Sequence, residues 1–234
     1  MDERRSRSAG RAGPQGDERQ REDLDPGIRY VNLTAELAPA CHRLELAAFP
    51  EADPDGLLSE EDIRLFADVF PAGYFVALDG DEPVGQGAGV FVPFDFETQV
   101  QHTIESVCGP HQCDNHDPEA PWYYGVDIAV LASHRGRGIG RKLYDLRKEL
   151  VRRHDKRGII AGGDLPGYPP HAEEMDIHTY VAKVVAGELT DPTLTMQLHN
   201  GFEVRGVIHE YLAHEHGEDH ASLIVWENPG YTGD

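Results

Sequence analysis

The segment 122–153 constrains the fold more than any other part of the chain. Residues 122–130 are aromatic and β-branched and predict a strand, while apolar residues at 139, 143, 146 and 150 predict an amphipathic helix. Between them, residues 133–140 contain glycine at 136, 138 and 140. A strand, a glycine-rich turn and a helix start bring free backbone N–H groups and the positive end of the helix dipole together. The segment therefore predicts an anion-binding site.

The spacing of the glycines excludes two common phosphate-binding patterns. A dinucleotide fingerprint that starts at Gly136 needs glycine at position 141, which is Arg141, and a Walker loop needs Gly-Lys-Ser/Thr, which the sequence lacks. A third pattern, Arg-x-x-Gly-x-Gly, is met by Arg135, Gly138 and Gly140.

Hydrophobic periodicity and breakers predict the other elements. Strands are expected at 28–33, 74–78, 84–92, 158–163, 203–212 and 222–226, and helices at 34–49, 59–69, 176–185 and 190–200. Residues 93–121 read as an irregular insertion rich in His, Pro and acids. This order of elements predicts an α/β fold with a mixed sheet and helices on both faces.

The Arg135–Gly140 loop, preceded by Ile128–Val130 and followed later by Asn200-Gly201-Phe202, resembles the acetyl-CoA pyrophosphate loop of the Gcn5-related N-acetyltransferases (GNAT). The resemblance implies a mostly antiparallel central sheet, and transfer of an acetyl group from acetyl-CoA to a primary amine by direct attack. Trp122–Gly125 and Gly162–Tyr168 further resemble the acetyltransferase domain fused to nitrilase-type hydrolases. Because the chain ends where that hydrolase would begin, we expect no hydrolase chemistry.

The resemblance assigns two binding roles residue by residue. The pyrophosphate would lie on the loop, and the pantetheine would align along the backbone of Ile128, Ala129 and Val130. The loop residues concerned are Arg135, Gly136, Arg137, Gly138, Ile139 and Gly140.

The proton-transfer groups are less clearly marked. Many family members carry a tyrosine four residues before the glycine of Gly-Phe, and this position is Gln197 here. An amide can donate a hydrogen bond to sulfur but cannot deliver a proton, so Tyr124, Tyr168, water or unassisted departure of the thiolate stay open. Candidates for the base are His102, Asp127 and Tyr124.

Cysteine and histidine alternate in Cys108-x-x-His111-x-Cys113-x-x-His116, a set of residue types that can bind zinc. The spacing is not that of a common zinc finger, so we expect an unliganded loop. Two rivals to the enzyme hypothesis stay open: a non-catalytic acyl-CoA-binding module, which Gln197 could signal, and a zinc-stabilised interaction domain.

The charge balance bounds the partners and the compartment. With 21 Lys+Arg against 42 Asp+Glu, the formal net charge is -21, which argues against binding to nucleic acid or an anionic membrane. Three cysteines and the lack of a signal-type apolar region fit a cytoplasmic protein. We expect a disordered tail over 1–26, the N-acetyltransferase domain over 27–229 and a short tail over 230–234. The partner would be a small-molecule or peptide amine, and a homodimer stays open.

The type of cation predicts a response to salt. The chain has 4 lysines and 17 arginines, and a high acid content with few lysines resembles the acidic proteome of halophilic organisms. We therefore expect the melting temperature to rise steeply as salt increases to molar concentrations, because salt screens the repulsion between carboxylates. Thermal melts measured across that range check this, and a melt independent of salt would contradict it.

Overall fold

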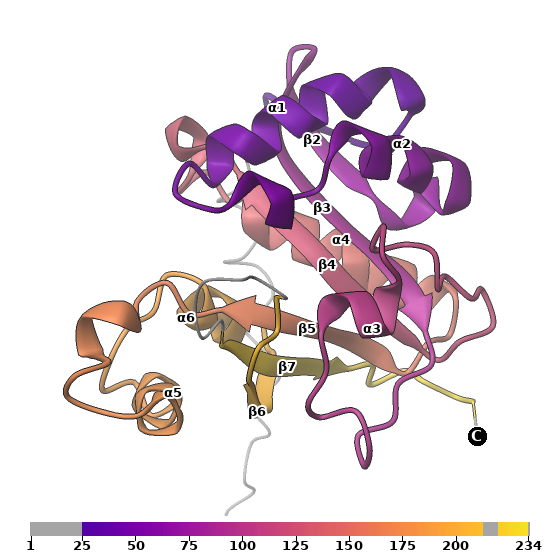
Figure 1. Ribbon diagram of the computed structural model, residues 1–234. Helices are drawn as coiled ribbons and strands as arrows, with labels where there is room; N and C mark the ends of the chain where they lie inside the picture. Colours follow the sequence, from indigo (N-terminus) through magenta and orange to yellow (C-terminus); the bar gives the residue numbers. More distant parts are fainter. Residues whose placement is uncertain (1–24, 213–219, 234) are drawn as a thin grey trace, which may run out of the picture.

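A seven-stranded sheet lies at the centre of the protein in the computed structural model, which describes residues 25–212 and 220–233 (Figure 1). The strand order is β1-β2-β3-β4-β5-β7-β6. The tail predicted for 1–26 lies outside the described residues except for its last two. The strands are β1 (Ile28–Asn32), β2 (Phe75–Asp79), β3 (Glu82–Val92), β4 (Trp122–Val130), β5 (Gly158–Asp164), β6 (Glu203–Ile208) and β7 (Ala221–Glu227).

Pairing in this sheet is antiparallel except between β4 and β5, which run parallel. Helices α1 and α2 cover one face of the sheet, which we call the front face, and α4 lies behind it (Figure 1). The predicted α/β architecture, a mixed and mostly antiparallel sheet with helices on both faces, is confirmed. The helices are α1 (Ala38–Ala48), α2 (Glu60–Val69), α3 (Ile104–Cys108), α4 (Ile139–Arg153), α5 (Ile177–Val185) and α6 (Leu194–His199).

Two predicted elements differ in detail. The single helix expected over 34–49 is a 3-10 turn, Ala35–Leu37, followed by α1. Pro39 lies in the first turn of α1, where its missing N–H breaks no helical hydrogen bond. The insertion 93–121 contains the short helix α3, whose start is fixed by a capping box between Thr103 and Ser106.

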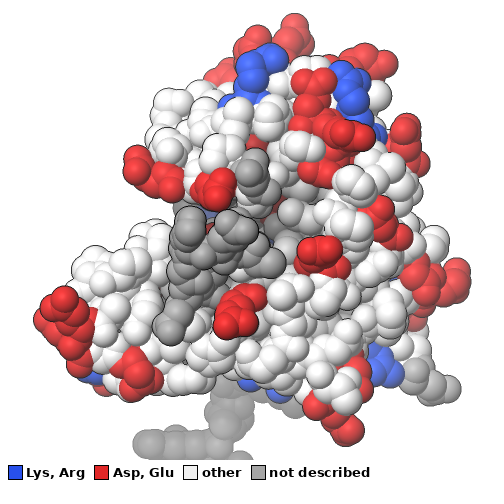
Figure 2. All heavy atoms as spheres, viewed as in Figure 1, with Lys and Arg blue, Asp and Glu red and all other residues white. Residues whose placement is uncertain are grey.

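The surface carries the excess of acid that the composition implies. Figure 2 shows aspartate and glutamate side chains spread over the front face, with few lysines or arginines among them. Among the described residues, no helix combines the length and the apolar character needed to cross a bilayer.

Adjacent tyrosines on β4 anchor both sides of the sheet. Tyr123 and Tyr124 are completely buried, and the Tyr123 hydroxyl donates to the carbonyl of Gly73 at 2.8 Å. Gly89 on β3 makes room for this arrangement, because a Cβ there would lie 2.4 Å from the Tyr123 ring and 2.4 Å from the carbonyl oxygen of Tyr124. The packing at the centre of the sheet therefore requires glycine at position 89.

We expect Gly89→Ala to lower the free energy of unfolding by about 1–3 kcal/mol, because the added methyl group overlaps a backbone atom that cannot move easily. Urea denaturation measures this change. Gly206→Ala is the control, since its Cβ would have Val100 as nearest neighbour at an ordinary 3.6 Å. Equal stability of the two variants would show that the centre of the sheet relaxes around residue 89.

Candidate functional site: the opening between β4 and β5

The parallel strands β4 and β5 separate after a short contact. Their pairing joins Trp122–Tyr124 to Gly158–Ile160, after which β4 continues along β3 as far as Val130 and β5 continues along β7 as far as Asp164. Figure 1 shows the two strands diverging toward the left of the view. Backbone polar groups on the facing edges of the opening are therefore available to a ligand, since buried N–H and C=O groups need partners.

A β-bulge begins the divergence. Gly125 of β4 pairs with Gly89 and Asp127 pairs with Ala88, so Val126 is an extra residue on β4. Such a bulge bends the strand and increases its local twist. It lies immediately after the last residue that pairs with β5.

Arg147 of α4 supports this bulge from behind. Its side chain is 2% exposed and donates to the carbonyls of Ala88, at 2.9 Å, and of Asp127. Gly87 and Gly125 leave space for the guanidinium, because a Cβ at either position would lie 3.0 or 3.2 Å from one of its nitrogens. One buried cation thus satisfies the two carbonyls of the bulge.

The loop from β4 to α4 has the geometry of an anion cradle. Gly136 and Gly138 both have φ of 77°, a left-handed conformation that favours glycine. Gly138 is the N-cap of α4 and provides no side-chain cap, so the first N–H groups of the helix are open to a ligand. A Cβ at Gly140 would meet nothing within 4 Å. The predicted combination of strand, glycine turn and helix start is therefore present.

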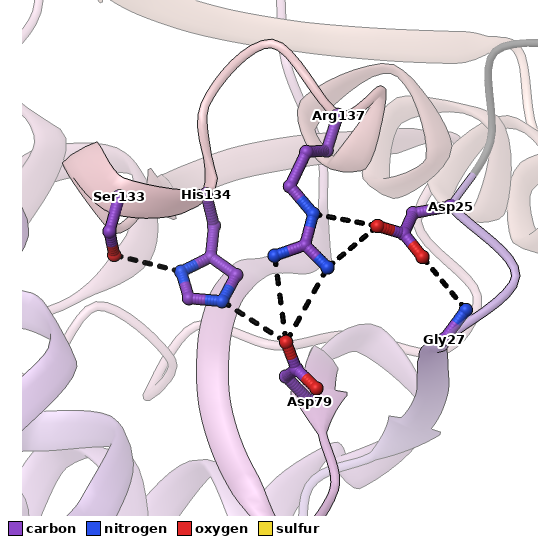
Figure 3. Close-up of polar contacts among 6 residues, drawn as sticks. All are labelled: Asp25, Gly27, Asp79, Ser133, His134 and Arg137. Atoms are coloured by element: carbon purple, nitrogen blue, oxygen red, sulfur yellow. Dashed lines mark hydrogen bonds and ion pairs between the residues drawn. The ribbon is translucent and has the colours of Figure 1, made fainter.

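The two arginine side chains of this loop are engaged with the scaffold. Arg137 binds Asp25 at 2.6 Å and Asp79 at 3.4 Å, and His134 contacts Asp79 at 3.3 Å (Figure 3). Arg135 donates to the backbone carbonyl of Val130 at 3.1 Å and also to that of Ala48. Both side chains hold the loop in place, which leaves the backbone amides as its main anion donors.

A polar cluster occupies the front face of β3 and β4. The amide nitrogen of Gln86 donates to Glu45 of α1 at 2.6 Å and to Asp127 of β4 at 3.1 Å. Burial, reinforced by the nearby charge of Asp127, raises the pKa of the Glu45 carboxyl to about 9. Burial also raises the pKa of Asp127, to about 6, although Arg147 opposes the shift. Asp127 is therefore a charged carboxylate at neutral pH that is more basic than usual.

A second polar chain lies beside the last β4–β5 pair. Nδ1 of His102 is 2.7 Å from the carbonyl of Gln99 and must donate to it. Burial lowers the pKa of His102, so the neutral ring accepts at Nε2 from the Tyr124 hydroxyl, 2.6 Å away. Tyr211 then donates to Tyr124 over 3.1 Å, and the Gly162 backbone partly opposes the rise in pKa that burial causes in both tyrosines. Hydrogen bonds thus run in one direction from Tyr211 to His102.

Gln197 and Tyr168 lie apart from both clusters. Gln197 of α6 is 3% exposed and packs on Gly163, where a Cβ would lie 2.5 Å from its side-chain oxygen. That oxygen has no hydrogen-bond partner among the described residues. The Tyr168 hydroxyl donates to the carbonyl of Met175 within its own loop.

The cysteines and histidines of the insertion point to different partners. Cys108 and Cys113 are buried thiols, whereas His111 binds Asp62 at 2.8 Å. His116 stacks on the Phe70 ring, 4.0 Å between centroids. In the described ranges, no three Cys, His, Asp or Glu side chains are grouped so as to hold a metal ion.

Four residues of these clusters escape sequence reasoning: Glu45, Gln86, Arg147 and Tyr211. Glu45 offered a signal, because it shares the buried side of α1 with Cys41, Leu44 and Ala48. A carboxyl on an apolar stripe needs a partner. The partner itself, on β4, could not be found from local sequence.

The chain belongs to the acetyltransferase (GNAT) family, since the profile of that family matches residues 38–165, more than half of its length. Among curated relatives, the Uncharacterized N-acetyltransferase YkwB of Bacillus subtilis (strain 168) is 29% identical over 189 residues, which cover 80% of this chain and 83% of the relative. The Probable hydrolase YhcX of the same organism is 32% identical over 189 residues. The match covers 80% of this chain but only 36% of YhcX.

A solved structure shows the same fold at low sequence identity. The GphF GNAT-like decarboxylase, in complex with isobutyryl-CoA, superposes with a TM-score of 0.70 at 16% identity. The match covers 86% of this chain and 99% of that one.

We expect Arg147→Met to lower the free energy of unfolding by about 3 kcal/mol, because two buried carbonyls lose a charged donor. Arg153→Met is the control, since this arginine is exposed at the end of the same helix. Chemical denaturation measures both variants. If they were equally stable, Arg147 would not be required to support the bulge.

Proposed function

We propose that this protein is an N-acetyltransferase that transfers an acetyl group from acetyl-CoA to a primary amine by direct attack. One observation carries the proposal: the β4–β5 ladder stops after three pairs, beside a glycine loop that ends on the open N-terminus of α4. An elongated ligand with an anionic group could lie in such an opening. Membership of the GNAT family and the similarity to YkwB support acyl transfer.

The backbone would hold the cofactor. We assign the pyrophosphate to the amides of Gly136–Gly140, which combine free N–H groups with the positive end of the α4 dipole. The pantetheine would pair with the edge of β4 at Ile128–Val130, which β5 leaves unpaired. The bound isobutyryl-CoA of GphF supports an acyl-CoA ligand for this fold.

The side chains of the front face would handle the protons. As the amine nitrogen bonds to the thioester carbon, the C–S bond breaks and the nitrogen must lose a proton. We assign this proton to Asp127, which is partly exposed and whose raised pKa improves its match to neutral pH. Tyr124 and Tyr211 provide O–H groups beside the opening, and Gln197 provides an amide that could donate to sulfur.

The acceptor would be cationic, either a small molecule or a peptide amine. Acidic side chains are spread over the front face, and their summed field attracts cations (Figure 2). The ammonium form would be attracted to this surface and would release one proton to water, so that the free amine attacks and Asp127 takes the proton lost as the C–N bond forms.

The experiment combines acetyl-CoA titration with a thiol-release assay over a panel of amines. Saturable binding and amine-dependent thiol release support the proposal. Binding without turnover on any amine would favour the non-catalytic acyl-CoA module, and no binding would favour an interaction domain.

We expect Asp127→Asn to lower kcat/KM about 100-fold while leaving the affinity for acetyl-CoA unchanged, because it removes a base but no cofactor contact. In the wild type, kcat/KM should rise with pH through about 6 as Asp127 loses its proton, and the variant should lack this limb. Asp145→Asn, on the exposed side of α4, is the control. An unchanged rate in Asp127→Asn would leave His102 or Tyr124 as the base.

A further inference from the structure

Glu45 forms a carboxyl pair with the assigned base. It lies on α1 with its side chain buried, 2% exposed, while Asp127 is partly exposed on β4. Gln86 bridges the two, because one amide nitrogen donates to Glu45 at 2.6 Å and to Asp127 at 3.1 Å, so an oxygen of each carboxyl lies against the same nitrogen. Two charged carboxylates held against one amide nitrogen in a buried site would repel each other strongly, so one of them keeps a proton.

The surroundings decide which carboxyl keeps that proton. Behind Asp127, the Arg147 guanidinium stabilises its negative charge. Glu45 faces instead Cys41 of its own helix and Tyr74 ahead of β2, both neutral because burial raises their pKa values. Among the described groups, those that most affect the pKa of Glu45 besides burial are Asp127, Gln86 and the Leu58 backbone, and none of these is a cation. Glu45 is therefore the protonated member, and its hydroxyl is the donor available to Asp127.

We propose that Glu45 is a positioning residue that holds Asp127 by a shared proton and thereby sets the pH at which Asp127 accepts a proton from the amine. The proposal rests on the proposed function for its catalytic consequence, but the shared proton itself does not. The hydrogen bond from Glu45 stabilises the charged form of Asp127 and fixes the orientation of its carboxylate toward Gln86. No bond other than O–H and N–H changes in this step.

The kinetic test compares two substitutions at one position. Glu45→Gln keeps a donor of the same shape, so its kcat/KM should rise through the same pH range as in the wild type. Glu45→Met keeps the volume but removes the donor. The rise of its kcat/KM with pH should therefore occur at a pH about one unit higher than in the wild type. Glu51→Gln and Glu51→Met, at an exposed carboxyl just after α1, are the matched controls.

A thermal test does not depend on activity. Glu45 has a folded pKa of about 9, whereas an unfolded glutamate titrates near about 4.3. Between these values the folded chain keeps a proton that the unfolded chain releases, so stability falls as pH rises across this window. Glu45→Gln has no such proton. The difference in melting temperature, Glu45→Gln minus wild type, should therefore increase steadily from about pH 5 to about pH 9.

Each outcome decides the matter. Two results together support the proposal. The melting temperature of Glu45→Gln rises with pH relative to the wild type, and the pH profile of kcat/KM shifts in Glu45→Met but not in Glu45→Gln. A constant difference in melting temperature would overturn the shared proton. If both variants lost turnover equally at every pH, Glu45 would be structural only. If the wild type released no thiol, the proposed function would fail, while the thermal test would still decide the shared proton.

Discussion

The structure depends on how β4 pairs with its two neighbouring strands. This strand must pair with β3 along its whole length, yet it must leave β5 after three residues. The bulge at Val126 makes both possible, because an extra residue bends the strand without ending its ladder. Arg147 satisfies the carbonyls that the bulge leaves exposed, and Gly87 and Gly125 give its guanidinium room. These residues thus build the opening into the sheet.

Several basic residues in and after α4 hydrogen-bond to the backbone inside the protein. Arg135–Arg157 contains ten of the chain's 21 basic residues. In the structure Arg147, Lys148 and Lys156 turn inward and donate to backbone carbonyls. A buried cation is tolerated when its donors are used in this way. In the proposed function, binding of the pyrophosphate is therefore assigned to the amides at the start of α4.

Protons on the front face are handled by two separate groups. The chain from Tyr211 to His102 is a neutral line of hydroxyl and imidazole groups, whereas Glu45 and Asp127 form a carboxyl pair with one proton. Burial shifts pKa values in both, but the results differ. Tyrosine is held protonated and His102 is held neutral, while Asp127 keeps its charge because Arg147 lies beneath it. The carboxyl pair is therefore better suited to accept a proton.

Local sequence determined the parts whose signals are short-range. The strand Trp122–Val130, the glycine loop and the apolar stripe of α4 follow from periodicity and from the backbone freedom of glycine, so the fold class and the position of the glycine loop could be predicted. Tertiary structure alone decided the rest. Glu45 and Asp127 are 82 positions apart in sequence, and α1 must pack on β4 before they meet. Likewise, Arg135 and Arg137 were predicted to bind an anion, and only the fold shows that their side chains also contact the carbonyl of Val130 and the carboxylate of Asp25. Which polar groups share a proton or a charge depends on distance in space, which no local pattern records.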